Sequence, residues 1–248
     1  MPLDPFLSSP RAAAGAPHVN AGPATFVVLL AKIPAARGLW HMQRFFFGRF
    51  GLRRVAGLRF HKVLGSGHGG GFGLRPSFTR HGVMAFFSDE ACARAFLASR
   101  FVEGYRQHAT ELFLATLTPV SCRGRWSGFT LDLPAQPLAP DTPVAALTRG
   151  SIHPLRAPLF WSKAAPAQAA VELAPGCQIA VGLGEAPLFR QATFSLWDSV
   201  AAMDAYARRG AHQEAIKASH QQGFFTESMF MRCVPRHVHG TWKGKHYG

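Results

Sequence analysis

Apolar and polar positions alternate along the chain in a way that predicts the same series of elements twice. Short runs rich in Val, Leu and Ile predict buried strands at 25–33 and 144–152, and the apolar spacing that follows predicts helices at 38–52 and 158–173. Two strands come next, and then a helix with an aspartate as its N-cap, Asp89 in the first half and Asp198 in the second. These two strands are predicted at 59–65 and 82–87, and at 177–183 and 191–197. A last strand ends each half, so the predicted order is strand, helix, strand, strand, helix, strand.

A sequence repeat supports this division into halves. Residues 111–128 and 227–244 align without a gap, and both contain the pattern E-x7-P-x4-G-x-W-x-G. The second copy begins at Glu227, which is 116 residues after Glu111. Residues 85–96 resemble 195–206 as well, at an offset of 110. Self-similarity of this kind indicates that one supersecondary unit occurs twice in the chain.

We therefore predict an α+β fold made of two ferredoxin-like repeats, packed sheet to sheet as a pseudo-dimer with helices outside. The sequence predicts a disordered leader at 1–24, because this stretch is rich in Pro, Ala, Gly and Ser. The first repeat is expected at 25–128 and the second at 144–248, as one compact unit. A Pro-rich linker at 129–143 joins them.

Composition and charge narrow the class of protein. With 48% hydrophobic and 16% charged residues, the chain is not intrinsically disordered. The 27 Lys+Arg and 13 Asp+Glu leave a formal charge of +14, so an anionic or amphiphilic partner is expected. The apolar run at 26–31 is too short to span a bilayer, and the leader lacks the apolar segment of a secretory signal. Four cysteines without a CxxC pair favour a reduced, cytoplasmic protein.

Common catalytic motifs are absent from the sequence. A GxGxxG pattern at 65–70 is followed by a predicted strand and not by a helix, so a hairpin loop is favoured over a dinucleotide site. GxSxG, HExxH and CxxCH do not occur. Any metal must then be held by imidazole. The best candidate is His212, on the apolar face of a predicted helix at 210–222, and the alternatives are His220 and His81. A purely structural role stays open for each of them.

A segment at 37–54 interleaves aromatic residues with arginines. Such a helix suits contact with a membrane surface or with a long apolar ligand. A helix with its aromatic side chains in the core and its arginines in water would have a similar sequence, and this alternative stays open. The charge would also suit nucleic acid, but no nucleic-acid-binding motif accompanies it, so no such partner is expected.

The chain resembles the spheroidene monooxygenase family of carotenoid biosynthesis over 25–244. Five segments carry the resemblance in order along both halves. They are Lys62-Val-Leu-Gly-Ser-Gly, Pro119-Val-Ser-Cys-Arg-Gly-Arg-Trp-Ser-Gly128, Pro143-Val-Ala-Ala-Leu-Thr-Arg149, Gly182-Leu-Gly-Glu-Ala-Pro187 and Gln191-Ala-Thr-Phe-Ser-Leu-Trp197.

This resemblance implies a haem-dependent monooxygenase that uses O2 and reduced ferredoxin. The expected reaction is hydroxylation at C2 of an acyclic carotenoid such as spheroidene, and repetition at that carbon gives the ketone spheroidenone. The resemblance also implies haem b and the dimeric α/β barrel of small haem oxygenases, chlorite dismutases and aldoxime dehydratases, in which a histidine of one half binds iron. We carry that role over to His212. The family often has histidine where this chain has Arg190, which could pair with a haem propionate.

Two expectations complete this picture. A carotenoid resides in a bilayer, so peripheral attachment to a membrane surface is expected, and the oligomeric state is left open. The alternative to an enzyme is a non-catalytic ferredoxin-like module that binds an apolar ligand or a membrane surface.

Overall fold

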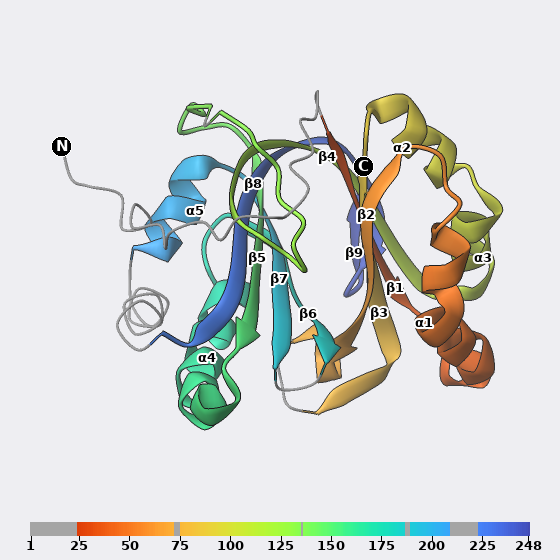
Figure 1. The fold of residues 1–248 in the computed structure, drawn as a ribbon, viewed down its shortest axis with the longest axis horizontal. Coiled ribbons are helices and arrows are strands. Elements are labelled where there is room, and N and C mark those ends of the chain that lie inside the picture. Colours follow the sequence, from red (N-terminus) through yellow and green to blue (C-terminus); the bar gives the residue numbers. More distant parts are fainter. Residues whose placement is uncertain (1–23, 72–74, 135, 187–188, 209–222) are drawn as a thin grey trace.

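A computed structural model describes residues 24–71, 75–134, 136–186, 189–208 and 223–248, with the backbone alone at 163–169 and 186. The helices and strands follow the order drawn in Figure 1. The first half contains β1 (Thr25–Lys32), η1 (Ala35–Arg37), α1 (Gly38–Leu52), β2 (Leu58–Gly67), η2 (His68–Gly70), β3 (Pro76–Phe87), α2 (Glu90–Leu97), α3 (Arg100–His108) and β4 (Glu111–Gly124). The second contains β5 (Val144–Ile152), η3 (Pro154–Arg156), α4 (Ala157–Glu172), β6 (Cys177–Ala186), β7 (Arg190–Trp197), α5 (Val200–Ala207), β8 (Phe225–Trp242) and β9 (Lys245–Tyr247).

Eight antiparallel strands form one sheet that closes into a barrel, as predicted. The strand order is β4-β1-β3-β2-β6-β7-β5-β8, and pairing of β4 with β8 closes the ring, while β9 adds a hairpin to β8. The halves were expected to pack as two sheets face to face. They instead share one continuous sheet, because both edges of each half find a partner strand in the other half.

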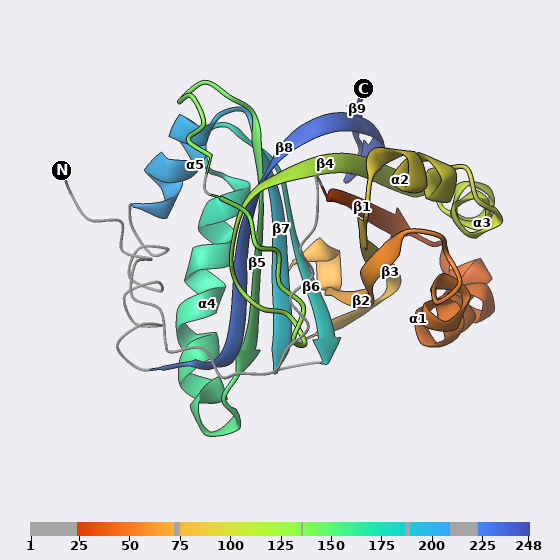
Figure 2. The same cartoon turned by 45° about the horizontal axis from the view of Figure 1, so that its top comes forward.

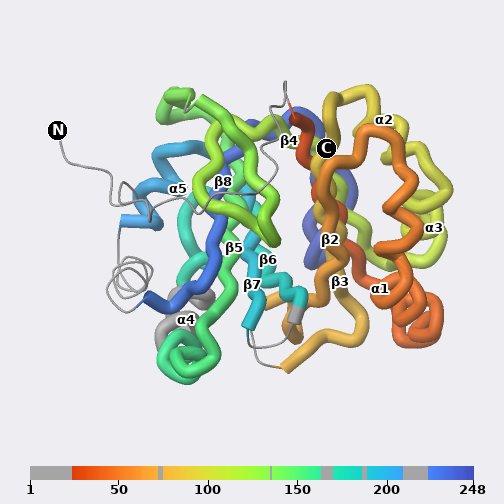
Figure 3. Tube along the Cα trace, viewed as in Figure 1, coloured from red at the N-terminus to blue at the C-terminus, as the bar shows by residue number. Residues whose placement is uncertain are grey.

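The two seams between the halves differ in length. Strands β4 and β8 pair from Phe113 against Gly240 to Gly124 against Met229, and Figure 3 shows them running together over one end of the barrel. Strands β2 and β6 pair through Gly65 with Gly184 and Ser66 with Leu183. The place where β2 and β6 meet, at the lower end in Figure 1, is called the β2–β6 end below. The last residues of β2 and β6 and the beginnings of α1 and α4 lie at this end.

Apolar side chains from both halves fill the barrel. Alternate residues of the strands point inward, including Val28, Leu30 and Phe86 of the first half and Leu147 and Phe194 of the second. Outside the barrel, α1, α2 and α3 cover one side and α4 and α5 cover the other (Figure 2). The inner side chains therefore make a packed core, and the outer faces of the sheet are where the two halves differ.

Local signals explain most of the helix boundaries. The Asp89 carboxylate accepts a hydrogen bond from the Cys92 N–H at 2.8 Å, which confirms Asp89 as the N-cap of α2. The predicted cap at Asp198 is wrong. Ser199 caps α5 by accepting from the Ala202 N–H at 3.1 Å, while Asp198 accepts from the side chain of Gln178. The first half also has an additional helix, α3, capped by Ser99.

Candidate functional site

The predicted ligands His212 and His220 lie outside the described residues, which stop at Arg208 and resume at Gly223. The elements on either side of this gap, α5 and β8, belong to the second half. The described residues of the second half are therefore compared with those of the first half below.

His81 lies in the closed core of the first half. Its Nε2 is 2.8 Å from the Tyr105 hydroxyl, its ring is 4.6 Å from that of His41, and its side chain is fully buried. Burial lowers the pKa of His81 to about 3, with smaller contributions from the nearby His41 and Arg44. The imidazole is thus neutral and packed between β3, α1 and α3, which favours a structural role for it.

The outer face of the first half is filled by its helices. Val27, Leu29, Val83 and Phe87 of the sheet are buried against helix side chains that include Phe96 and Tyr105. A face packed in this way leaves no room for a bound molecule.

The corresponding face of the second half is packed in part, because Val144, Ala146 and Trp197 of the sheet lie in a buried cluster with Val200 and Met203 of α5. Small and polar residues lie further along the same face. Thr148 of β5 pairs with Thr193 of β7, and Thr193 pairs with Gly182 of β6. Ser228 of β8 lies one pair further along, opposite Gly150. Thr148 and Ser228 are exposed although they belong to strands inside the sheet. We call Thr148, Gly182, Thr193 and Ser228 the small-residue face.

Arg190 begins β7 opposite Ser151 of β5, and it shares the strand alternation of Ala192 and Phe194, which point into the barrel. Its side chain is exposed. A guanidinium there is available to a carboxylate of a bound molecule, which is the role expected of Arg190. Among the residues whose side chains are described, no group of three or more His, Cys, Asp or Glu could hold a metal ion.

A buried ionic cluster that the sequence did not predict joins the two halves. The Lys62 Nζ is 2.7 Å from Glu185 Oε2, and an Arg149 nitrogen lies 3.6 Å from Glu185 Oε1. Arg149 also pairs with Glu227, and the Trp126 indole N–H donates to Glu185. Lys62, Trp126, Arg149 and Glu185 each belong to a different one of the five segments that carried the family resemblance. The polar residues within these segments are therefore the sequence signal that could have revealed the cluster.

The charges of this cluster balance, so it serves structure more than proton transfer. Burial alone would raise the pKa of Glu227, but hydrogen bonds from Ser127 and Gly128 and the charge of Arg149 lower it overall. Lys62 of β2 and Glu185 of β6 bridge the seam where the backbone pairing is short. The cluster therefore reinforces that seam.

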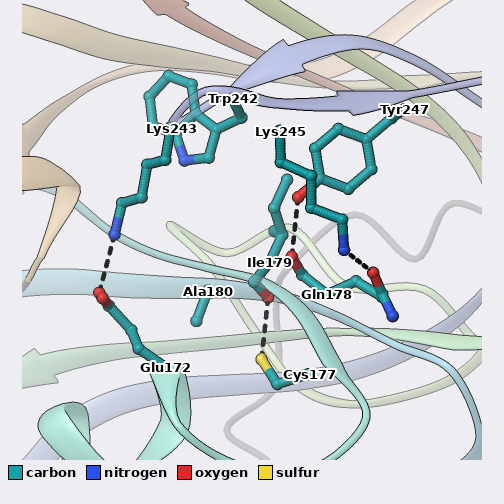
Figure 4. Close-up of a pocket in the computed structure, with 9 residues that line it drawn as sticks. All are labelled: Glu172, Cys177, Gln178, Ile179, Ala180, Trp242, Lys243, Lys245 and Tyr247. Carbon is teal, nitrogen blue, oxygen red and sulfur yellow. Dashed lines mark hydrogen bonds and ion pairs between the residues drawn. The ribbon is translucent and has the colours of Figure 1, made fainter.

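A cleft of about 220 Å³ lies between β6 and the β8–β9 hairpin (Figure 4). Most of its polar groups are paired with each other, and the buried indole N–H of Trp242 has no hydrogen-bond partner among the described residues. Lys243 Nζ is 2.9 Å from Glu172, and the Tyr247 hydroxyl donates to the Gln178 carbonyl at 2.8 Å. Burial raises the pKa of the Cys177 thiol to about 11, so the thiol is protonated near neutral pH. These contacts tie the hairpin to β6 and offer no reactive group.

Comparison with known proteins identifies relatives of the whole chain. No family model matches it. A spheroidene monooxygenase from Rubrivivax gelatinosus is 52% identical over 94% of this chain and 90% of its own length. A spheroidene monooxygenase from Rhodobacter capsulatus is 38% identical over 83% of this chain and 87% of its own. An aldoxime dehydratase solved in complex with butyraldoxime superposes with a TM-score of 0.59 over 89% of this chain and 82% of its own, at 8% identity, which shows a common fold.

Proposed function

The chain belongs to the spheroidene monooxygenase family, and on that premise we propose that it oxygenates an acyclic carotenoid such as spheroidene. The observation that carries this proposal is the 52% identity to a named spheroidene monooxygenase along almost the whole chain. The proposed step inserts one oxygen atom of O2 into the C–H bond at C2. The other atom leaves as water, with two electrons from reduced ferredoxin and two protons. A second hydroxylation at C2 and loss of water give the ketone.

We also propose that the two halves are ferredoxin-like repeats. In each half the chain runs strand, helix, strand, strand, helix, strand, apart from the added α3 and the C-terminal β9. In each half the fourth strand lies beside the first, and the third lies between the first and the second. This order is the one expected of that motif.

Haem b is the proposed cofactor, because oxygenation of an unactivated C–H bond needs chemistry that side chains cannot supply. When bound, haem would supply the activation of O2. We propose that haem lies beside the small-residue face, where Thr148 and Ser228 are exposed. The exposed Arg190 guanidinium at the start of β7 would pair with a propionate. His212 would hold the iron, and His220 is the alternative.

The proposed electron donor, ferredoxin, also suits the charge of the chain. With a formal charge of +14, this protein attracts an acidic carrier over distances of about 10 Å at moderate ionic strength. Among the described residues, no helix is long and apolar enough to cross a membrane. We propose that the chain reaches its apolar substrate by attaching to a membrane surface.

The test is conversion of spheroidene by the purified protein supplied with haem, O2 and reduced ferredoxin, followed by mass spectrometry of the carotenoid. A product heavier by one oxygen atom is expected. His212→Ala should remove the Soret band and the product together, while His220→Ala should retain both. Absence of an oxygenated product from a protein that holds haem would favour the non-catalytic module that binds an apolar ligand.

A further inference from the structure

Helix α1 presents a row of large apolar side chains to solvent. The exposed fractions of Leu39, Met42, Phe46 and Phe50 are 77%, 44%, 51% and 45%. Their spacing of three and four residues places them on one face of the helix, and Phe47 flanks this row. We call these five residues the α1 stripe. The alternative in which the aromatic residues of 37–54 face the core is therefore wrong for Phe46, Phe47 and Phe50. The buried face of α1 consists of His41, Gly48 and Leu52 instead.

The α1 stripe is surrounded by positive charge. The guanidinium carbons of Arg49 and Arg53 lie 4.8 and 4.9 Å from the centre of the Phe50 ring. The sequence has no Asp or Glu between Asp4 and Asp89. Arg49 and Arg53 form no ion pair within the described part of the chain. The stripe thus combines exposed phenyl rings with cations that have no carboxylate partner there.

More exposed apolar side chains lie at the β2–β6 end. Of the ten large hydrophobic residues that are exposed in the described ranges, five form the α1 stripe, and Leu173 lies at the far end of α4. The other four are at the starts of β3 and β7 and around the start of α4, namely Phe78, Leu155, Leu159 and Phe189. In Figure 1 these elements begin at the same end of the barrel as α1. Nine of these ten side chains therefore come from elements that begin at one end of the barrel.

We propose that the α1 stripe and the β2–β6 end form a docking surface for an anionic lipid bilayer. The phenyl rings would enter the boundary between headgroups and acyl chains, and Arg49 and Arg53 would bind lipid phosphates beside them. The charge argues against a second copy of this chain, because two such faces would bring arginine against arginine. An acidic protein would suit the arginines but would leave the row of exposed rings without a role.

This docking surface rests on the proposed function in one respect, since a bilayer is where an apolar carotenoid would be met. The surface itself follows from α1 and its surroundings. The surface spans the end of the barrel where both α1 and α4 begin, so both halves of the chain contribute to it.

The test measures sedimentation of the full chain with vesicles of phosphatidylcholine, with and without phosphatidylglycerol. We expect binding to vesicles that contain phosphatidylglycerol, weakened about tenfold or more by the triple substitution Phe46→Ser, Phe47→Ser and Phe50→Ser. Leu173→Ser is the matched control, because Leu173 is an exposed apolar residue outside the surface. It should bind like the wild type.

A second variant, Arg49→Glu with Arg53→Glu, tests the charges without removing the rings. It should bind these vesicles at least about tenfold more weakly, and raised salt should weaken the wild type. Equal binding of wild type and both variants would overturn the proposal, as would no binding to any vesicle. If the wild type is a dimer and the triple substitution dissociates it, the docking surface binds a second copy of this chain. That result would also overturn the proposal. The vesicle assay contains no carotenoid, haem or electron donor. A failure to bind vesicles therefore does not bear on the oxygenation of spheroidene, which is measured separately in detergent.

Discussion

The Glu227 carboxylate in the second half of the barrel accepts a hydrogen bond from the backbone N–H of Ser127 in the first half, at 2.9 Å. The reciprocal contact is also present, because the Glu111 carboxylate accepts from the backbone N–H of Lys243 at 2.9 Å. Ser127 and Lys243 both have φ of 51°, in a left-handed turn that non-glycine residues seldom adopt. The repeated pattern E-x7-P-x4-G-x-W-x-G therefore describes an exchange in which the glutamate of each half stabilises a turn of the other.

The buried cluster predicts a large effect on stability at Arg149. Replacement by Leu removes the partner of Glu227 and one partner of Glu185, which leaves carboxylates without full compensation in a mostly buried site. The free energy of unfolding should fall by about 3 kcal/mol or more, measured by denaturant titration. Arg125→Gln is the control, since Arg125 is half exposed and lies 3.9 Å from the same carboxylate. A loss below about 1 kcal/mol is expected there. Equal losses of unfolding free energy in both variants would contradict a larger contribution from the buried Arg149–Glu227 pair.

Glu227 also predicts a pH dependence. Its pKa is lower in the folded protein than the usual 4.5, so the folded state binds fewer protons than the unfolded state. The ionised Glu227 carboxylate therefore stabilises the folded state fully above pH 4.5, and this stabilisation is lost as the pH falls through the lowered pKa. The difference in unfolding free energy between wild type and Glu227→Gln should be largest near neutral pH and should shrink in acid. A difference that stays constant from neutral to acidic pH would show that ionisation of Glu227 contributes nothing.

The turn glycines give a test of the repeat pattern. Gly124 has φ of 79°, and a Cβ there would collide with the carbonyl oxygen of Ser228 on the paired strand. Gly128 has φ of 80°, but no atom lies within 4 Å of its added Cβ. Gly128→Ala should cost about 1–2 kcal/mol from backbone strain alone. Gly124→Ala should cost clearly more, because the β4–β8 pairing must shift, and thermal unfolding would measure both. Similar losses would mean that the pairing tolerates the extra atom.

The small-residue face predicts that bulk at Thr148 interferes with haem. Thr148→Trp places an indole where the proposed cofactor would lie against the sheet, so the amount of haem retained per protein, read from the Soret band, should fall about tenfold or more. Ala95→Trp is the control, because Ala95 is exposed on α2 of the other half. Near-ultraviolet circular dichroism would establish that both variants are folded. Full haem retention by a folded Thr148→Trp protein would place the cofactor elsewhere.

Much of the fold could be predicted, because strand and helix periodicity survive in a single sequence. The helix at 38–52 was predicted with the bounds that the structure gives. The repeat predicted two halves, and the family resemblance implied the closed barrel. Caps were less certain, since Asp198 and Ser199 are both good N-cap residues and only backbone geometry selects Ser199.

The candidate site was harder to predict. No sequence motif marks small residues such as Thr148 and Gly182, and only the strand pairing places them together on one face. The exposed rings of α1 could not be told from core residues, because both faces of that helix carry apolar groups. Arg149, Glu185 and Glu227 lie far apart in sequence, so their cluster depends entirely on the closure of the barrel.

The unequal seams have a mechanical consequence. At the β2–β6 seam the paired residues Gly65 and Gly184 bring no side chains across. The seam is held mainly by the ionic cluster and by the hydrogen bond that the Ser66 hydroxyl donates to the Gly182 carbonyl, at 2.8 Å. The β4–β8 seam is long and carries the reciprocal glutamate contacts. Local openings follow the path of lowest free energy. We therefore expect the barrel to open locally at the β2–β6 seam before the β4–β8 seam. Backbone amides beside Gly65 and Gly184 should then exchange their protons with water sooner than those of the long seam.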